Sequence, residues 1–301
     1  MSVTDVSTHT TPRADRPHPN SPGSAGGRGR AARRALLYLG LAIVLLGSVL
    51  PMVWAVSGSF KSIDEIFAIP PHLIPKHATF ANYVTVFTDI SLPKWLWTSL
   101  WTALVSTTIS VIFSTMGGYA FAKFRFRGSQ ILFDIMFSSM MIPVTVLVIP
   151  LFVQIAGMGL GNSYVALILP WLAPAFGIFM MRQFIVQAVP TQMIEAARID
   201  GAGELSIFFR IVLPVLRPAL GALAVWLFLT SYNNFMWPLI VIADANKYTL
   251  PLGLNSLTSA YTADYGVILA GSVIAAIPTV ALFIALRKQL ISGLTLGAVK
   301  G

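Results

Sequence analysis

Amide, hydroxyl and aromatic side chains gather near the end of one apolar stretch of the sequence. They are Ser231, Tyr232, Asn233, Asn234 and Trp237. Amides donate and accept hydrogen bonds and aromatic faces stack on C–H surfaces, so this combination suits a hydroxylated ligand such as a sugar. Polar side chains also bond neighbouring helices in a membrane, and tryptophan favours membrane interfaces. These residues therefore form a candidate substrate path, with helix packing as the alternative.

The residue patterns that support covalent or metal chemistry are missing from the sequence. There is no cysteine, and no lysine follows a glycine, so the phosphate-binding GxxxxGK[ST] motif of an ATPase is excluded. The sequence also lacks a GxSxG or HExxH motif. The four histidines do not have the sequence spacing of a known metal-binding motif; they are His9, His18, His72 and His77. We therefore expect no catalytic residue, no metal site, no cofactor bound by this chain and no enzyme activity.

The composition indicates which solvent surrounds these side chains. Of the 301 residues, 56% are hydrophobic and 10% are charged, and the mean hydropathy is +0.77. Soluble domains carry roughly 25% charged residues, so this balance favours a membrane protein.

Six uncharged runs are long enough to cross a bilayer, which takes about 20 apolar residues. Residues 135–181 contain no charge and are too long for one helix, so the glycine-rich stretch 157–163 is expected to turn between two spans. Unpaired peptide groups are costly in hydrocarbon, so the spans should be helices. The sequence predicts an all-α polytopic membrane protein whose spans lie in residues 35–60, 95–122, 135–181 (two spans), 218–243 and 266–286.

The positions of the basic residues predict the orientation. Most of the 20 Lys and Arg residues lie in the N-terminal tail, after the second and fourth spans, and at the C-terminus. The positive-inside rule therefore places both termini in the cytoplasm of a bacterial cell, with the spans in its plasma (inner) membrane. Residues 1–34 are rich in Ser, Thr, Pro, Gly and Arg and are expected to form a disordered cytoplasmic tail. The net charge of +9 is explained by topology and membrane lipid, so no nucleic-acid partner is expected.

The longest predicted cytoplasmic connection, residues 183–217, has a helix–turn–helix pattern. Thr191 is expected to cap a short helix that begins just after Pro190. Glu195 and Arg198 are three residues apart and could form an ion pair on one helix face.

The first helix of this connection should end at Asp200-Gly201, because glycine tolerates the left-handed backbone that ends helices. A second apolar helix is expected at about residues 205–213, ending at Pro214. From spacing alone, an amphipathic elbow at the membrane surface remains open as the alternative to a specific contact.

The connection resembles the EAA loop of binding-protein-dependent ABC importer permeases (type I). The similar residues are Glu195-Ala196-Ala197, Asp200-Gly201-Ala202, Phe208, Ile211, Leu213-Pro214 and Pro218. The similarity extends over nearly all of residues 35–301 and points to the sugar-uptake branch, in particular its maltose-permease second-subunit type. The stretches that carry it are SFK at 59–61, FAKFRFRG at 121–128, MMIP at 140–143, FGIFMMRQF at 176–184, NNFMWPL at 233–239, YTLPLGL at 248–254 and GLTLGAVKG from 293.

The resemblance implies a permease unit over residues 35–301. Its parts would be a core ABC transmembrane domain at about 95–287, the coupling loop 183–217 and a C-terminal cytoplasmic tail, 287–301. Members of this family couple to their ATPase through the first short helix of the loop. The residues that would make this contact are Glu195, Ala196, Ala197, Arg198, Asp200 and Gly201.

The implied function is ATP-driven carbohydrate import by alternating access. The implied partners are a second permease subunit, two ATPase subunits that bind ATP and Mg²⁺, and an extracytoplasmic sugar-binding protein. Two alternatives remain at this point: a permease for another solute such as glycerol phosphate, and a stand-alone secondary carrier. The absence of ionisable residues deep in the spans speaks against an ion-coupled carrier.

Overall fold

A computed structural model describes residues 26–258 and 264–296, and these residues form helices, turns and loops without a β-strand. The chain divides into two compact units, Met1–Met52 and Val53–Gly301. In the first unit, helix α1 (Gly26–Gly58, which continues into the second unit) presents exposed apolar side chains such as Leu36, Leu41 and Leu45. A helix that is apolar on all sides suits a lipid environment.

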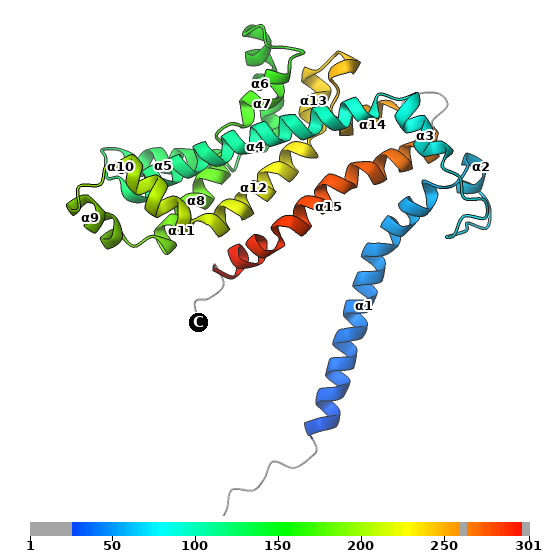
Figure 1. Cartoon of the computed structure of the whole chain (residues 1–301), viewed down its shortest axis with the longest axis horizontal. Helices are drawn as coiled ribbons and strands as arrows, with labels where there is room; N and C mark the ends of the chain where they lie inside the picture. The colour runs from blue at the N-terminus through cyan, green and yellow to red at the C-terminus, as the bar shows by residue number, and fades with distance from the viewer. Residues whose placement is uncertain (1–25, 259–263, 297–301) are drawn as a thin grey trace, which may run out of the picture. The chain divides into compact units, whose positions relative to one another are not determined.

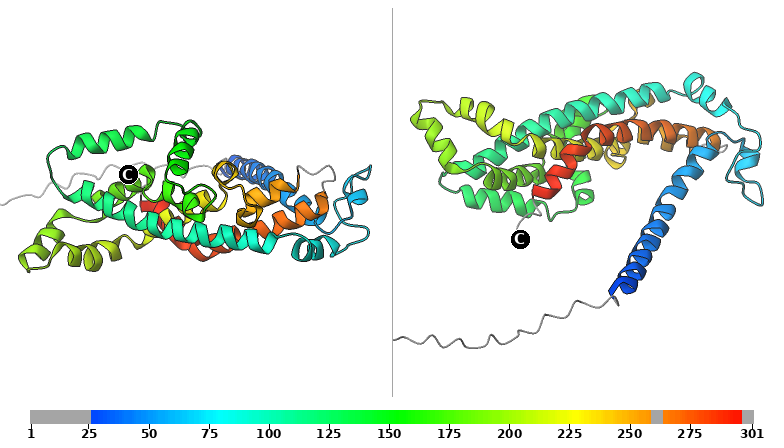
Figure 2. Two further views of the ribbon diagram at one scale, coloured as in Figure 1. Left: turned by 90° about the horizontal axis from the view of Figure 1, so that it is seen from above. Right: turned by 60° about the horizontal axis from the view of Figure 1, so that its bottom comes forward.

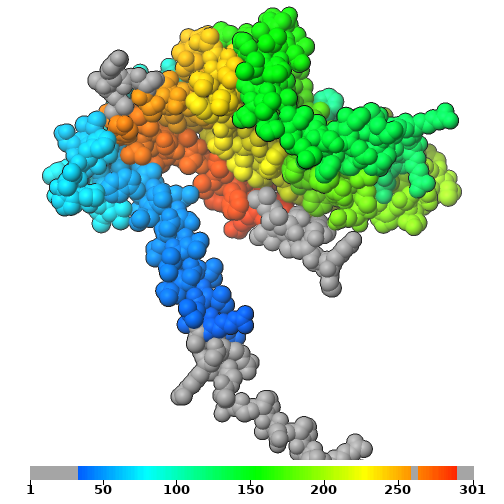
Figure 3. Space-filling view, turned by 180° about the vertical axis from the view of Figure 1, so that it is seen from behind, coloured from blue at the N-terminus to red at the C-terminus, as the bar shows by residue number. Residues whose placement is uncertain are grey.

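The second unit is a bundle around three long helices: α4 (Leu92–Lys123), α12 (Arg217–Tyr232) and α15 (Tyr265–Leu296). α12 packs against both α4 and α15, and α8 packs along α4 (Figures 1 and 2). From behind, the yellow surface of α12 lies between the green surface of α5–α8 and the orange-red surface of α15 (Figure 3). The other helices of this unit are α2 (Ile63–Ile66), α3 (Ala81–Thr88), α5 (Ser129–Ser139), α6 (Val144–Gly157), α7 (Tyr164–Ile168), η1 (Leu169–Trp171), α8 (Ala175–Ala188), α9 (Thr191–Ile199), α10 (Glu204–Ile207), the π-helix η2 (Phe208–Val212), α11 (Leu213–Val215), α13 (Met236–Val241), η3 (Ala245–Lys247) and α14 (Leu250–Ser256).

The prediction of a helical polytopic membrane protein is confirmed. Among the residues that the structure describes, three helices are long and apolar enough to cross a membrane, with their spanning parts at Arg33–Gly58, Leu92–Lys123 and Tyr265–Gln289. Three bent helix pairs bring the number to six if each pair is one span. They are Ser129–Ser139 with Val144–Gly157, Tyr164–Trp171 with Ala175–Ala188, and Glu204–Val215 with Arg217–Tyr232. The number six stays a prediction.

The breaks follow local sequence signals. Pro143 lies between α5 and α6, whose axes differ by 103°. The helix breaks here because proline fixes its own φ and disfavours helix in the residue before it. The turn expected near 157–163 is present, with Gly159 at φ 71° and Asn162 at φ 53°.

Both ends of the membrane unit are more helical than expected. α1 begins at Gly26, so residues 26–34 are helical rather than part of a disordered tail; residues 1–25 lie outside the described residues. Extending an existing helix costs far less than starting one, and Ala31, Ala32 and the arginines beside them favour it. In the same way α15 continues through Leu296 into the expected C-terminal tail, whose last five residues, 297–301, are not described.

Small side chains line the contact between α4 and α8. Ser114 is fully buried, and a Cβ added at Gly177 would lie 2.3 Å from its Oγ. A Cβ added at Gly118 would lie 2.7 Å from Cβ of Met181. Small residues let membrane helices approach closely, so this seam holds the centre of the bundle together.

Candidate functional site

The loop between α8 and α12 folds into a short helix, a tight turn and a second helix, which we call the knob (residues 190–216). α9 begins at Thr191, directly after Pro190. The expected Thr191 cap is wrong: Thr191 is the first helical residue, and its Oγ1 instead accepts a hydrogen bond from Nζ of Lys123 at 3.4 Å. The second helix also differs from the prediction, because it runs through α10, η2 and α11 past Pro214 to Val215. Pro214 fits there because it occupies the first turn of α11.

The turn at Gly201 is confirmed. Gly201 has φ 79°, and the N–H of Ala202 donates to the carbonyl of Ala197 at 2.9 Å. The N–H of Gly201 donates to the carbonyl of Arg198 at 3.0 Å. These two hydrogen bonds end α9, and they require the left-handed backbone conformation at Gly201 that glycine adopts readily. A Cβ at Gly201 would meet no atom within 4 Å, so the backbone angle, not crowding, requires glycine.

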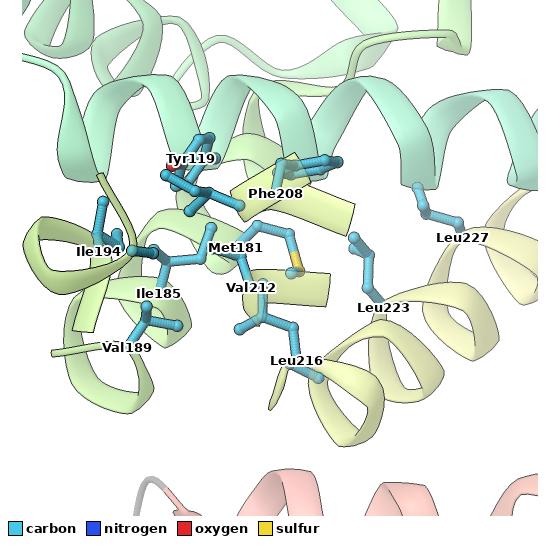
Figure 4. Close-up of a cluster of buried hydrophobic side chains, with 13 residues drawn as sticks. Tyr119, Met181, Ile185, Val189, Ile194, Phe208, Val212, Leu216, Leu223 and Leu227 are labelled. Carbon is cyan, nitrogen blue, oxygen red and sulfur yellow. The ribbon is translucent and has the colours of Figure 1, made fainter. Parts of the chain in front are cut away.

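An apolar cluster fastens the knob to the membrane helices (Figure 4). From the knob it includes Ile194, Ala197, Ile207, Phe208 and Val212, and from the helices of the bundle it includes Tyr119, Met181, Ile185 and Leu223. In Figure 4 the rings of Tyr119 and Phe208 lie beside each other, and their centroids are 5.3 Å apart. A movement of the knob would therefore act on α4, α8 and α12 through packed side chains.

The predicted coupling residues divide between two faces of the knob. Ala197 is buried in the chain's own cluster, whereas Glu195, Ala196, Arg198, Asp200 and Gly201 are exposed.

Three large apolar side chains share this exposure. They are Ile199, Leu205 and Phe209, which are 86%, 71% and 59% exposed. The sequence did not identify them as exposed, because the neighbouring apolar residues Ile207 and Phe208 are buried. Only the side of the helix on which each residue lies distinguishes the exposed residues from the buried ones. The exposed apolar and charged side chains together make a surface suited to docking another protein.

Arg198 pairs with a different partner from the one expected. Its Nε donates to Oε1 of Glu204 at 2.6 Å, instead of to Glu195, because the Gly201 turn brings the start of α10 back beside the end of α9. The hydroxyl of Tyr119, on α4, reaches Oε2 of Glu204 at 3.3 Å. The hydrogen bond from Arg198 lowers the pKa of Glu204 below its ordinary value. Glu204 thus joins both halves of the knob to α4.

A second region of interest is a cavity of about 520 Å³ that opens at the surface of the helix bundle. Two of the five predicted path residues, Ser231 and Asn234, line it. Its other polar and aromatic lining residues, which the sequence did not single out as one site, are Ser106, Ser110, Ser139, Trp171, Phe176, Trp226 and Thr230. They come from α4, η1, α8, α12 and the end of α5, so only the tertiary fold brings them together.

The side chains of the other three predicted path residues donate hydrogen bonds to backbone carbonyls of this chain. The hydroxyl of Tyr232 donates to the carbonyl of Ala275 at 3.0 Å, and Nε1 of Trp237 donates to the carbonyl of Ala166 at 2.8 Å. Asn233 is exposed, and its Nδ2 donates to the carbonyl of Leu229 at 3.0 Å. None of these three residues is among those that line the cavity.

No group of three or more His, Asp or Glu residues able to hold a metal ion occurs within residues 26–258 and 264–296.

Comparisons with known proteins agree with this architecture. The chain is 38% identical over 270 residues to the arabinooligosaccharides transport system permease protein AraQ of Halalkalibacterium halodurans, covering 88% of this chain and 96% of that protein. It is 35% identical over 263 residues to the lactose transport system permease protein LacG of Rhizobium radiobacter, covering 87% and 95%. A chain from the crystal structure of a bacterial ABC transporter involved in alginate import has the same fold, with a TM-score of 0.75, 23% identity and coverage of 89% and 99%. Residues 110–290 match a family described as the inner membrane component of binding-protein-dependent transport systems, and the chain belongs to that family.

Proposed function

We propose that this chain is a membrane permease subunit of an ATP-driven carbohydrate importer. The relatives support this, because AraQ and LacG are named as permeases for arabinooligosaccharides and lactose and align over nearly their whole length. The observation that carries the proposal is the exposed end of the knob around Glu195, Ala196 and Gly201, which is anchored to three membrane helices and free on its far side.

The importer would contain several further proteins. A second permease subunit completes the pathway, two ATPase subunits bind ATP and Mg²⁺, and an extracytoplasmic sugar-binding protein delivers the substrate. This chain performs no covalent chemistry. Its termini and knob lie in the cytoplasm, as the distribution of Lys and Arg predicts, and its helices cross the bacterial plasma (inner) membrane.

The mechanism is mechanical. When the two ATPase subunits close on ATP, they push on the exposed face of α9. Ile194 and Ala197 transmit the movement to the cluster that contains Met181 and Leu223, so α8 and α12 shift against α4. The bundle then changes the side to which its pathway opens. Glu195 supplies a charge for a basic partner, while Ala196 allows close approach and Gly201 maintains the turn.

Crosslinking tests the contact with the ATPase. The chain has no cysteine, so no native cysteine of this subunit has to be replaced before a single one is introduced. In membranes that contain the whole transporter, Ala196→Cys should crosslink to a cysteine on the ATPase subunit. Thr88→Cys, exposed at the end of α3 and predicted to face outside, is the matched control and should not. Failure of Ala196→Cys to crosslink while assembly is intact would contradict the coupling role.

Transport measurements in vesicles test the function itself. Uptake of labelled arabinotriose, lactose or diacetylchitobiose should require ATP, the ATPase subunits and the binding protein. Uptake of these sugars by this chain alone would refute the proposal and favour a stand-alone carrier.

A further inference from the structure

Three interruptions of the membrane helices meet at the cavity. The break between α5 and α6 contributes Ser139, Met140 and Ile142, and the break between η1 and α8 contributes residues 173–174. The break between α12 and α13 contributes Asn234. In hydrocarbon, interrupted helices leave peptide groups without partners, so they are tolerated where they are buried in protein or line a polar cavity. Discontinuous helices are also a common setting for substrate sites in transporters.

The lining of this cavity contains hydrogen-bond donors with unused capacity. Nε1 of Trp171 is buried, and no described residue accepts its hydrogen. Oδ1 of Asn234 accepts from the N–H of Trp237 at 3.2 Å, whereas its Nδ2 donates to none of the residues described. A buried donor without an acceptor costs free energy, so a ligand or water that accepts from it gains a favourable bond.

The hydroxyl of Ser110 places the indole of Trp171 at the cavity. Its Oγ lies 2.6 Å from the carbonyl oxygen of Trp171 and 2.6 Å from that of Ser106, so its one hydrogen is shared between η1 and α4. The backbone that carries the indole is therefore held by a hydrogen bond. The N–H of this indole has no acceptor among the described residues of the packed bundle.

The aromatic members of the lining favour a ligand with apolar faces. The ring centroids of Phe176 and Trp226 lie 4.3 Å apart, at an interplanar angle of 43°. Such faces stack well against the C–H surface of a sugar ring, while Ser106 and Ser231 can exchange hydrogen bonds with its hydroxyls.

Charge selects between the classes of solute. Within the described part of the chain, the residues that line the cavity include no Lys, Arg, His, Asp or Glu. A phosphate ester or another anion would lose its hydration there without gaining a cation, which is strongly unfavourable. The volume of about 520 Å³ is within the range of small-ligand sites.

We infer that this cavity is a saccharide-binding subsite built by this subunit itself, where Trp171 Nε1 and Asn234 Nδ2 donate to hydroxyls of a neutral sugar and the Phe176–Trp226 pair stacks on its ring. This inference rests on the proposed function. It assigns Ser231 and Asn234 to the substrate path, it makes Tyr232 and Trp237 packing residues, and it leaves Asn233 as an exposed residue at the end of α12. A subsite without charged lining residues favours a neutral sugar over glycerol phosphate.

Protection of an introduced thiol tests the subsite directly. Ser231→Cys is placed in the otherwise cysteine-free chain, in the assembled transporter, and treated with a neutral methanethiosulfonate reagent. Arabinotriose, lactose and diacetylchitobiose serve as saccharide probes, and glycerol 3-phosphate is the charged probe. At least one saccharide should slow modification of Ser231→Cys, and glycerol 3-phosphate should not. Modification of Thr88→Cys, outside the cavity, should be insensitive to every probe.

Removal of the single N–H tests the role of Trp171. The double variant Ser231→Cys with Trp171→Phe keeps an aromatic ring at position 171. The saccharide concentration needed to protect the cysteine should rise by about 2- to 10-fold, the effect of one lost hydrogen bond. Trp97→Phe, at a position that is 67% exposed and outside the lining, is the matched control and should leave it unchanged.

The outcomes separate the subsite from the proposed function. If the wild-type transporter imports one of the saccharides but none of them protects Ser231→Cys, the subsite is refuted and the proposed function stands. Equal protection with and without Trp171→Phe overturns the role of the indole donor. If the complete wild-type transporter imports none of the three sugars, the result counts against the proposed function, and the subsite falls with it.

Discussion

Gly201 offers the sharpest test of the knob, because its requirement for glycine is one of backbone angle alone. Its φ is 79°, and a Cβ there would meet no atom within 4 Å. An L-residue in the left-handed region costs about 1–2 kcal/mol, and a β-branched side chain costs more. That free energy equals a factor of about 5–30 in the population of the native turn. We therefore expect Gly201→Ala to weaken coupling and Gly201→Val to abolish it, while the chain still inserts and assembles.

Asparagine at the same position is the matched control. Asn is larger than Ala but tolerates positive φ, so Gly201→Asn should retain more coupling than Gly201→Ala. The assay compares ATP hydrolysis stimulated by the binding protein with sugar uptake in reconstituted vesicles. If the loss instead followed side-chain size, so that Asn was worse than Ala, the backbone argument would be refuted. Normal stimulated hydrolysis and uptake in Gly201→Val would refute the role of the turn.

Other positions give further expectations. Gly118→Ala should destabilise the purified protein by about 1–3 kcal/mol, because its Cβ would lie 2.7 Å from Cβ of Met181. Gly117→Ala, whose Cβ would lie 3.3 Å from Cγ1 and Cγ2 of Ile178, should cost less than Gly118→Ala in the same detergent unfolding assay. Trp237→Phe should cost about 1–3 kcal/mol in that assay by leaving a buried carbonyl unpaired, and unchanged unfolding would contradict its packing role. Glu204→Gln should reduce uptake per ATP hydrolysed, because it removes the charge that pairs with Arg198. The pKa of Glu204 is lowered, so the wild-type ion pair is present above pH 4.5 and is lost only as the pH falls below that value. Wild-type coupling at pH 5 should therefore still exceed that of the variant.

The features that sequence predicts well are those with a local cause. Apolar runs specify helices in lipid, Pro143 separates α5 from α6, and Gly201 ends α9, each through the chemistry of a few neighbouring residues. The start of α1 at Gly26 shows the limit of this reasoning, because a helix stabilised along its apolar part extends into residues whose own composition suggests disorder.

The side-chain partners in the knob depend on tertiary structure. Ala196 and Ala197 are identical residue types in adjacent positions, yet one is exposed and the other is buried against the bundle. Successive helical residues point about 100° apart, so the packing of α9 against the apolar cluster decides which alanine is covered. The partner of Arg198 is Glu204 rather than Glu195 for a similar reason, since the direction of the chain after Gly201 is a property of the folded turn.

The two tryptophans near the predicted substrate path show why residue type alone could not identify the site. Trp237 looked suited to bind a ligand, but its indole N–H is already used by the carbonyl of Ala166. Trp171 lies far from the amide cluster in sequence, yet the fold makes it a lining residue of the cavity, and its buried N–H has no acceptor among the described residues. In a medium of low dielectric constant an unpaired donor is costly, whereas a donor that already has an acceptor gains little from a ligand. Which polar groups remain unpaired after folding is therefore a property of the tertiary structure, and residue type alone does not reveal it.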